Sequence, residues 1–159
     1  MRVVADGDEV DAATLLDRAG FDAESNVLTE RQAEVLALRE HGLTQAAIAD
    51  RLGTSRANVS AVERAARDNV ERARETVGVA DALAAPVRVT VGVGVDLHEV
   101  PSRVYAAADE AGVKVNQTAP DLMRTIGRGA GDAVEDRRVV DPLLVGVTRS
   151  GAVRVRRRR

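Results

Sequence analysis

The chain has 159 residues, of which 45% are apolar and 30% charged, the balance of a folded globular protein rather than of a disordered one. Its apolar residues are small: 27 Ala and 26 Val stand beside one Phe, one Tyr and no Trp, so we expect additional burial between domains or subunits. No apolar run approaches the roughly 18 residues that span a bilayer, the N-terminus is acidic where a signal peptide is basic, and the absence of cysteine excludes disulfides and thiolate chemistry. These features predict a cytoplasmic protein without membrane contact.

Charge is unevenly distributed along the chain, although the net charge is only -2. Residues 1–28 carry a net charge of -5, residues 29–77 are neutral, residues 78–153 carry -2 and residues 154–159 carry +5. The arginine-rich last segment is expected either to neutralise DNA phosphates without reading sequence or to be a solvated terminus.

The first half of the chain is predicted to be helical. A short helix is expected over residues 11–19. A second helix begins with the capping box of Thr29 and Gln32 and ends at Gly42, because glycine adopts the left-handed backbone that closes a helix.

Two more helices follow in the first half. One covers residues 44–52 and is broken by Gly53, and a longer one begins near Ser55 and continues to about Val77. The apolar positions of the long helix are spaced three or four residues apart, as one helical face requires.

The second half changes to the two-residue period of β-strands. It predicts a strand over residues 87–95, a helix over 101–111, a short strand over 113–115, a helix over 119–127, and a closing hairpin of strands 143–148 and 152–155. The order is therefore β-α-β-α-(α)-β-β, in which the bracketed helix stands for the ambiguous stretch up to Asp141. Gly151 occupies the hairpin turn, where a positive φ is needed.

The segment from Gln45 to Arg64 has the spacing of a DNA-reading helix-turn-helix. Ala49 stands where the two helices cross closely, so its side chain must be small. Gly53 follows where the tight turn favours a left-handed backbone, and Val59 can pack back onto the preceding helix. In this motif the N-terminal part of the second helix enters the major groove.

The polar side of the helix that begins near Ser55 supplies the predicted base contacts. Arg56 can pair with guanine through its planar fork, Asn58 can pair with adenine, and Ala57 can touch a thymine methyl group. Helix starts hold phosphates through hydroxyl and N–H groups. The predicted DNA-binding residues are Thr44, Gln45, Thr54, Ser55, Arg56, Ala57, Asn58, Ser60 and Arg64. The alternative is a three-helix unit whose polar face is solvated and binds proteins.

The neutral charge of residues 29–77 predicts weak binding by this region alone, because strong DNA-binding domains have a net basic footprint. A homodimer on two half-sites would multiply the contributions of two weak readers. The apolar stripe of the long helix is expected either to pair with its twin or to pack within one chain. That stripe consists of Val62, Ala66, Val70, Ala73 and Val77.

The predicted fold class is α+β, with an N-terminal three-helix helix-turn-helix domain that has a long third helix and a small α/β C-terminal domain that ends in a β-hairpin. The expected parts are an N-terminal extension with a short helix at residues 1–27, the helix-turn-helix DNA-binding domain at 28–78, the α/β domain at 86–156, and a basic tail at 157–159.

Two parts of the chain resemble the Tfx family of archaeal DNA-binding transcriptional regulators. The first is LTERQAEVLALREHGLTQAAIADRLGTSRANVS at residues 28–60, and the second comprises DLHEVP at 96–101 and VTRSGAV at 147–153. The first part also looks like the output domains of bacterial response regulators and the promoter-reading region of sigma factors. The Tfx resemblance implies a helix-turn-helix on the N-terminal side and a family-specific C-terminal domain.

The sequence thus predicts a sequence-specific transcriptional regulator that binds double-stranded DNA as a homodimer. The alternative is a ligand-responsive regulator whose C-terminal domain senses a small metabolite or oxyanion near residues 92–101. Asp96, His98 and Glu99 in that segment are expected to be caps and solvated side chains rather than metal ligands. We expect no cofactor, no metal and no enzymatic activity, because no group of residues forms a recognisable catalytic set.

Overall fold

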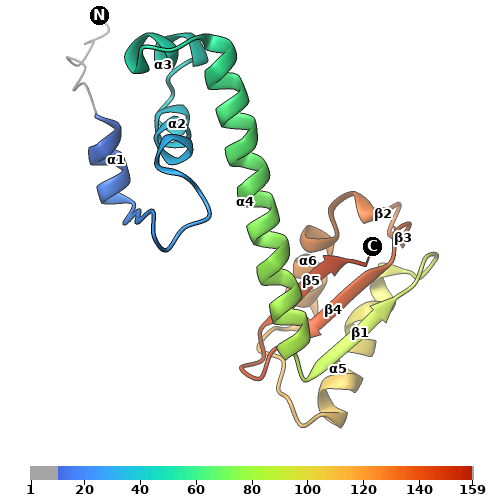
Figure 1. The fold of residues 1–159 in the computed structure, drawn as a ribbon. Coiled ribbons are helices and arrows are strands. Elements are labelled where there is room, and N and C mark those ends of the chain that lie inside the picture. Colours follow the sequence, from blue (N-terminus) through green and yellow to red (C-terminus); the bar gives the residue numbers. More distant parts are fainter. Residues whose placement is uncertain (1–10, 159) are drawn as a thin grey trace, which may run out of the picture. The chain divides into compact units, whose positions relative to one another are not determined.

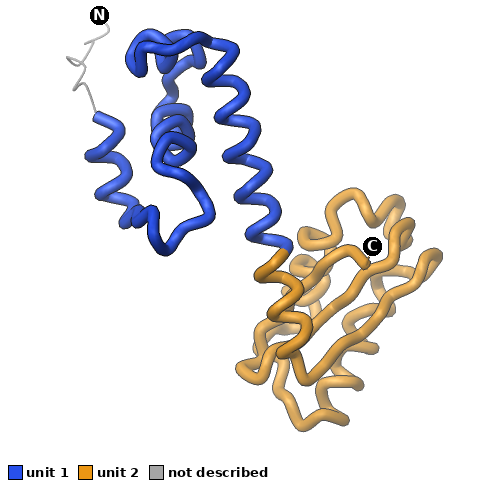
Figure 2. The backbone as a smooth tube through the Cα atoms, in the orientation of Figure 1, with its two compact units in different colours: residues 1–75 blue, residues 76–159 orange. Residues whose placement is uncertain are grey.

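The structure is a computed structural model that describes residues 11–158. The chain forms two compact units, residues 1–75 and residues 76–159, and the division falls within one long helix (Figure 2). Each unit has its own hydrophobic core. The predictions for residues 1–10 and for Arg159 lie outside the described residues.

The first unit is helical, as predicted. Its elements are α1 (Ala12–Arg18), α2 (Glu30–Glu40), α3 (Gln45–Leu52) and the first part of α4 (Arg56–Ala84) (Figure 1). The capping box that begins α2 is confirmed: the Gln32 N–H donates to Thr29 Oγ1 at 3.2 Å, and the Thr29 N–H donates to Gln32 Oε1 at 3.2 Å. The core of this unit is built on Ala12, Val35, Leu38, Ile48, Ala49 and Val59.

Helix α4 continues beyond the predicted end near Val77 and stops at Ala84. Gly78 does not end it, because the residues that follow include Ala and Leu, which favour helix more than most other residues. Pro86 sets the limit, since proline disfavours helical backbone at the residue before it. Residues 76–84 of α4 therefore belong to the second unit.

The second unit combines a small antiparallel sheet with two helices and confirms the predicted α+β fold class. Its elements after α4 are β1 (Val87–Val91), the short 3-10 turn η1 (Leu97–Glu99), α5 (Val100–Glu110), α6 (Ala119–Ala130), the turn η2 (Gly131–Ala133), β2 (Val134–Glu135), β3 (Arg138–Val139), β4 (Leu143–Val147) and β5 (Val153–Arg157). The main sheet has the order β1-β4-β5, and β2 pairs with β3 in a separate two-stranded ribbon.

Alternation along the three main strands gives this sheet two different faces. Odd-numbered residues such as Val91, Val145 and Val153 belong to the core, together with buried residues of α5 and α6 such as Val104 and Ile126. Even-numbered residues of the same strands lie on the opposite face. Helices α5 and α6 therefore cover one side of the sheet only, as Figure 1 shows behind the strands.

Three details of the second unit differ from the sequence-based predictions. The strand that was expected to reach Val95 ends at Val91, because the chain turns and the Gly94 N–H donates to Val139 O. Residues 113–115 form no strand, although Val113 and Val115 pack against the core. The helix that was expected to end at residue 127 continues to Ala130.

The hairpin between β4 and β5 is present as predicted, and Gly151 has φ +84° in its turn. A Cβ atom at this position would overlap the carbonyl oxygen of Lys114 and would lie 2.8 Å from the Asn116 side chain. Glycine is therefore needed at position 151 for two reasons: the backbone is left-handed, and residues 114–116 approach it closely.

We predict that Gly151→Ala lowers the free energy of unfolding by about 3 kcal/mol, because it adds overlap to backbone strain. Gly112→Ala is the matched control in the same unit, since Gly112 also has a positive φ but has open space around the missing Cβ. It should cost only about 1 kcal/mol. Urea unfolding of the two variants measures the difference, and equal losses would contradict the close approach.

Candidate nucleic-acid interface

Helices α3 and α4 are joined by a tight turn of the kind that the sequence predicts. Gly53 has φ 63° and ψ 39°, the left-handed conformation. The Thr54 N–H donates to Ala49 O at 3.0 Å and closes the end of α3. The packing prediction is also confirmed, since Ala49 is buried in the same cluster as Ile48 and Val59, with Leu52 beside them.

The beginning of α4 presents polar side chains to solvent. Ser55 caps the helix, because its Oγ accepts a hydrogen bond from the Asn58 N–H at 3.1 Å. The Asn58 Nδ2 donates to Thr54 Oγ1 at 2.9 Å, which orients the amide towards the helix start while it stays exposed. Arg56 and Ala57 are exposed, and neither has a hydrogen bond or ion pair from its side chain within residues 11–158.

The other predicted DNA-binding residues lie beside this helix start. Thr44 caps α3, with its Oγ1 accepting from the Ala47 N–H at 3.1 Å. Gln45, Ser60 and Arg64 line one shallow polar hollow between α3 and α4, together with Arg67. The fold of this unit thus brings most of the predicted residues to one region, and it also gives the Gln45 side chain a hydrogen-bond partner inside the unit.

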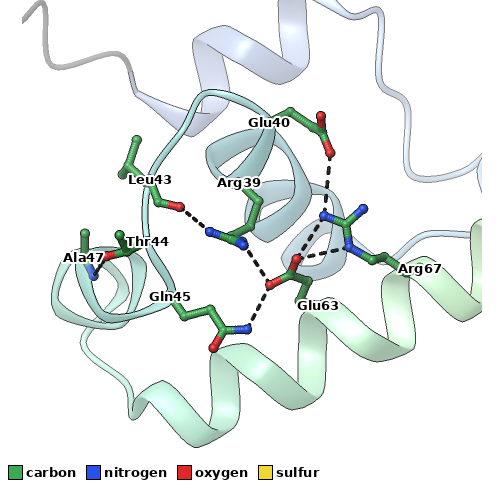
Figure 3. A network of polar contacts seen from close by, with 8 residues as sticks. All are labelled: Arg39, Glu40, Leu43, Thr44, Gln45, Ala47, Glu63 and Arg67. Atoms are coloured by element: carbon green, nitrogen blue, oxygen red, sulfur yellow. Dashed lines mark hydrogen bonds and ion pairs between the residues drawn. The ribbon is translucent and has the colours of Figure 1, made fainter.

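A buried carboxylate is that partner and connects three helices (Figure 3). Glu63 of α4 is only 7% exposed. Its Oε2 accepts from Gln45 Nε2 at 3.0 Å and from Arg39 Nε at 3.0 Å, and its Oε1 accepts from Arg67 at 2.9 and 3.0 Å. Arg39 also donates to Leu43 O at 2.8 Å, so the network holds α2, the loop before α3, α3 and α4 together.

These donors lower the pKa of Glu63, in the first place through the Gln45 hydrogen bond and then through Arg67 and Arg39, against burial, which acts in the opposite direction. Arg67 is paired with Glu63 and lies 3.6 Å from Glu40, so its guanidinium group belongs to this network. The sequence holds a clue to the network: Glu63 stands between Val62 and Ala66 on the apolar side of a helix, four residues before Arg67.

The network also changes how the neutral charge of the helical region is distributed. Between residues 51 and 67 the sequence has four Arg and one acid, and that acid is Glu63. Because Glu63 is buried and accepts hydrogen bonds from arginine, it contributes little negative potential outside. The surface at the start of α4 is therefore positive, with Arg56 and Arg64 exposed and no acid from residue 54 to residue 62.

Residues 92–101, which the alternative assigns to ligand binding, use several of their polar groups in hydrogen bonds within the chain. The backbone N–H groups of Gly94, Leu97 and Glu99 donate to other backbone oxygens, and the His98 N–H donates to Asp96 Oδ1 at 2.9 Å. That hydrogen bond is also the main reason why the pKa of Asp96 is lowered. Val100 and Pro101 at the start of α5 are buried, so this helix start offers no open anion site.

No cluster of three or more potential metal ligands occurs within residues 11–158, and none of the helices there has both the length and the apolar character to cross a membrane. Glu99 was the third candidate metal ligand beside Asp96 and His98. Its carboxylate forms an ion pair with Arg103 at 3.0 Å.

The geometry thus defines a helix-turn-helix unit followed by a small α/β unit, and comparison with known proteins identifies the family. A model described as DNA-binding protein, TFX, C-term matches residues 73–155, and a model of Sigma-70, region 4 matches residues 26–71. This chain belongs to the Tfx family of DNA-binding transcriptional regulators.

Relatives from archaea cover most of the chain. A protein of Haloarcula marismortui that is named for transcriptional regulation is 50% identical over 149 residues, 94% of each chain. DNA-binding protein Tfx of Methanothermobacter thermautotrophicus is 37% identical over 126 residues, 79% of this chain and 91% of the relative. A regulatory protein of Methanocaldococcus jannaschii is 37% identical over 128 residues, 80% of this chain and 93% of the relative. The resemblance drawn from the sequence is confirmed.

We predict that Glu63→Gln lowers the free energy of unfolding by about 2 kcal/mol at pH 7, because it removes the charge that the three donors surround. Folding lowers the pKa of Glu63, so the stabilisation is present above the unfolded pKa of about 4.3 and is lost as the pH falls through the folded value. Urea unfolding followed by circular dichroism should therefore show a difference between wild type and variant that shrinks in acid.

Glu40→Gln is the control for this measurement, because the Glu40 side chain is 74% exposed and its ion pair with Arg67 is long. We expect it to change stability by less than about 1 kcal/mol. A loss in Glu63→Gln that is the same at every pH would contradict the role assigned to the carboxylate charge.

Proposed function

We propose that this protein reads specific DNA sequences in the major groove with the N-terminal part of α4. The observation that carries the proposal is the exposed polar start of α4, held by a left-handed turn and by the Glu63 network at a defined angle to α3. A reading helix must keep its angle while its side chains form hydrogen bonds with base edges.

Arg56 is proposed as the main base contact, because its exposed guanidinium can bind guanine O6 and N7 in a bidentate manner. Asn58 can contact adenine, Ala57 can touch a thymine methyl group, and Ser60 can reach a base or a phosphate. We propose phosphate contacts for the remaining residues of the predicted set, which lie at helix starts or further along α4: Thr44, Gln45, Thr54, Ser55 and Arg64. Gln45 would use its backbone N–H, since its side chain binds Glu63.

We also propose that the protein binds DNA as a homodimer. The part of α4 that belongs to the second unit exposes Val77 by 60%, Val79 by 41% and Leu83 by 73%. Asp81 is the only charged residue between 76 and 84, and it pairs with Arg154. A helix whose solvent side carries no charge is typical of a protein interface.

This apolar surface at the end of α4 differs from the apolar stripe of residues 62–77 that the sequence suggests for the dimer. Val62 packs against the core of the first unit and Ala66 is fully buried, so neither is available to a second copy. Only Val77 at the far end of the stripe is exposed enough to take part.

The ligand-responsive alternative receives no specific support from the C-terminal unit. The cavity under the end of α4 has a volume of about 80 Å³, whereas sites for metabolites usually measure about 300–1,000 Å³. A larger open groove of about 550 Å³ follows α1 and α2, outside the unit to which the alternative assigns sensing. A thermal-shift screen with oxyanions and metabolites would reveal an effector through a raised melting temperature.

We predict that Arg56→Ala weakens specific binding by about 1–3 kcal/mol, because it removes a bidentate base contact. Footprinting on DNA upstream of genes in the source genome would first locate the bound site. Arg56→Lys is the matched variant: it keeps the charge but lacks the planar fork, so it should lose discrimination while it retains non-specific affinity. Unchanged protection by Arg56→Ala would remove Arg56 from the reading set.

We predict that Leu83→Glu separates the homodimer into monomers, because a charge at the centre of an apolar contact must be desolvated. Sedimentation velocity at micromolar concentration measures the change. Val27→Glu is the control, since Val27 is also an exposed apolar residue, at 62%, but lies before α2. A wild-type protein that sediments as a monomer with and without DNA would contradict the dimer itself.

A further inference from the structure

The face of the β1-β4-β5 sheet opposite α5 and α6 carries arginines around the end of α4, and the helix-turn-helix does not use them. In the strand register, Arg88 of β1 and Arg154 of β5 both lie opposite Gly146 of β4, while Thr90 and Arg156 both lie opposite Leu144. All are even-numbered positions, opposite to the side that α5 and α6 cover. Two strands from distant parts of the sequence therefore contribute arginine to one face.

Arg88, Arg154 and Arg158 remain exposed. Arg154 pairs with Asp81 at 3.5 Å, yet its side chain is still 63% exposed. Arg88 is exposed and donates to Ala82 O at 3.5 Å, a long hydrogen bond. Arg158 is exposed and continues the same alternation, and its backbone N–H donates to Pro142 O at 2.8 Å, which ties it to the sheet.

The face is strongly positive as a result. Arg88, Arg154 and Arg158 are exposed there, Arg156 is half-buried beside the end of α4, and Asp81 of α4 pairs with Arg154. Arg157 points to the other side by alternation and pairs with Asp132. Side chains on alternate residues of a strand stand roughly 7 Å apart, so the guanidinium groups of β5 can each reach a different phosphate.

We infer that this arginine face binds the phosphate backbone of double-stranded DNA, as a contact surface in addition to the reading helix. The inference rests on the proposed function, because the same duplex is the target. Residues 154–159 carry +5, so this face can add attraction that is independent of sequence to that of the positive start of α4. A small anion is a poorer match, because the arginines form a row and the cavity beside them holds only about 80 Å³.

The test compares the full-length wild-type chain with the double variant Arg156→Gln/Arg158→Gln. Fluorescence anisotropy would measure binding to the footprinted duplex and to a scrambled duplex over a range of KCl in which circular dichroism shows both proteins folded. Each lost phosphate contact should reduce the slope of log K against log salt by about 0.9, so the double variant should be shallower by about 1.8 on both duplexes. The preference for the footprinted duplex should not change.

Arg103→Gln/Arg124→Gln is the matched control. It removes the same charge from α5 and α6, which lie on the other side of the sheet, and should leave the slope unchanged. A slope in Arg156→Gln/Arg158→Gln equal to that of wild type, or an equal decrease in the control, would overturn the inference.

The two proposals can fail separately in this experiment. If Arg56→Ala keeps full preference for the footprinted duplex while Arg156→Gln/Arg158→Gln has the shallower slope, the reading helix is wrongly assigned and the arginine face stands. If Arg56→Ala loses that preference while the slope of the double variant is unchanged, the reading helix stands and the arginine face does not bind DNA.

Discussion

The helix-turn-helix depends on one buried carboxylate. Glu63 accepts hydrogen bonds from Arg39, Gln45 and Arg67, and so joins α2, α3 and α4 at a single point. The apolar core beside it combines Leu38 and Ile48 with smaller residues such as Ala49 and Val59, and burial of such groups is non-directional. Hydrogen bonds have directional requirements that such a core lacks, and they therefore define the angle at which α4 leaves the unit.

The same carboxylate reconciles a neutral domain with an anionic target. A count of charges over residues 29–77 gives zero and argues against DNA binding, yet burial removes Glu63 from the surface and leaves Arg56 and Arg64 exposed at the start of α4. The potential that a duplex meets depends on where charges lie and how well they are solvated, and a sum over the sequence contains neither property.

Much of the first unit could be predicted because its determinants are local. The capping box of Thr29 and Gln32, the left-handed Gly53 and the small Ala49 each act over a few residues, within reach of sequence reasoning. The second unit was predicted less well. Its hairpin around Gly151 has a local turn and was found, whereas the end of β1 at Val91 depends on a hydrogen bond between Gly94 and Val139, which lie far apart in the sequence.

The sequence by itself determined the α+β class, the helix-turn-helix spacing, the closing hairpin and the resemblance to Tfx regulators, because short-range sterics, capping and periodicity are written in neighbouring residues. Only the tertiary structure decided that Arg39 and Gln45 face Glu63 and that Arg88 joins Arg154 and Arg156 on one face of a sheet. These contacts join residues on different helices or on strands from opposite ends of the second unit. Their partners are set by strand register and helix crossing, and both depend on how the whole unit packs.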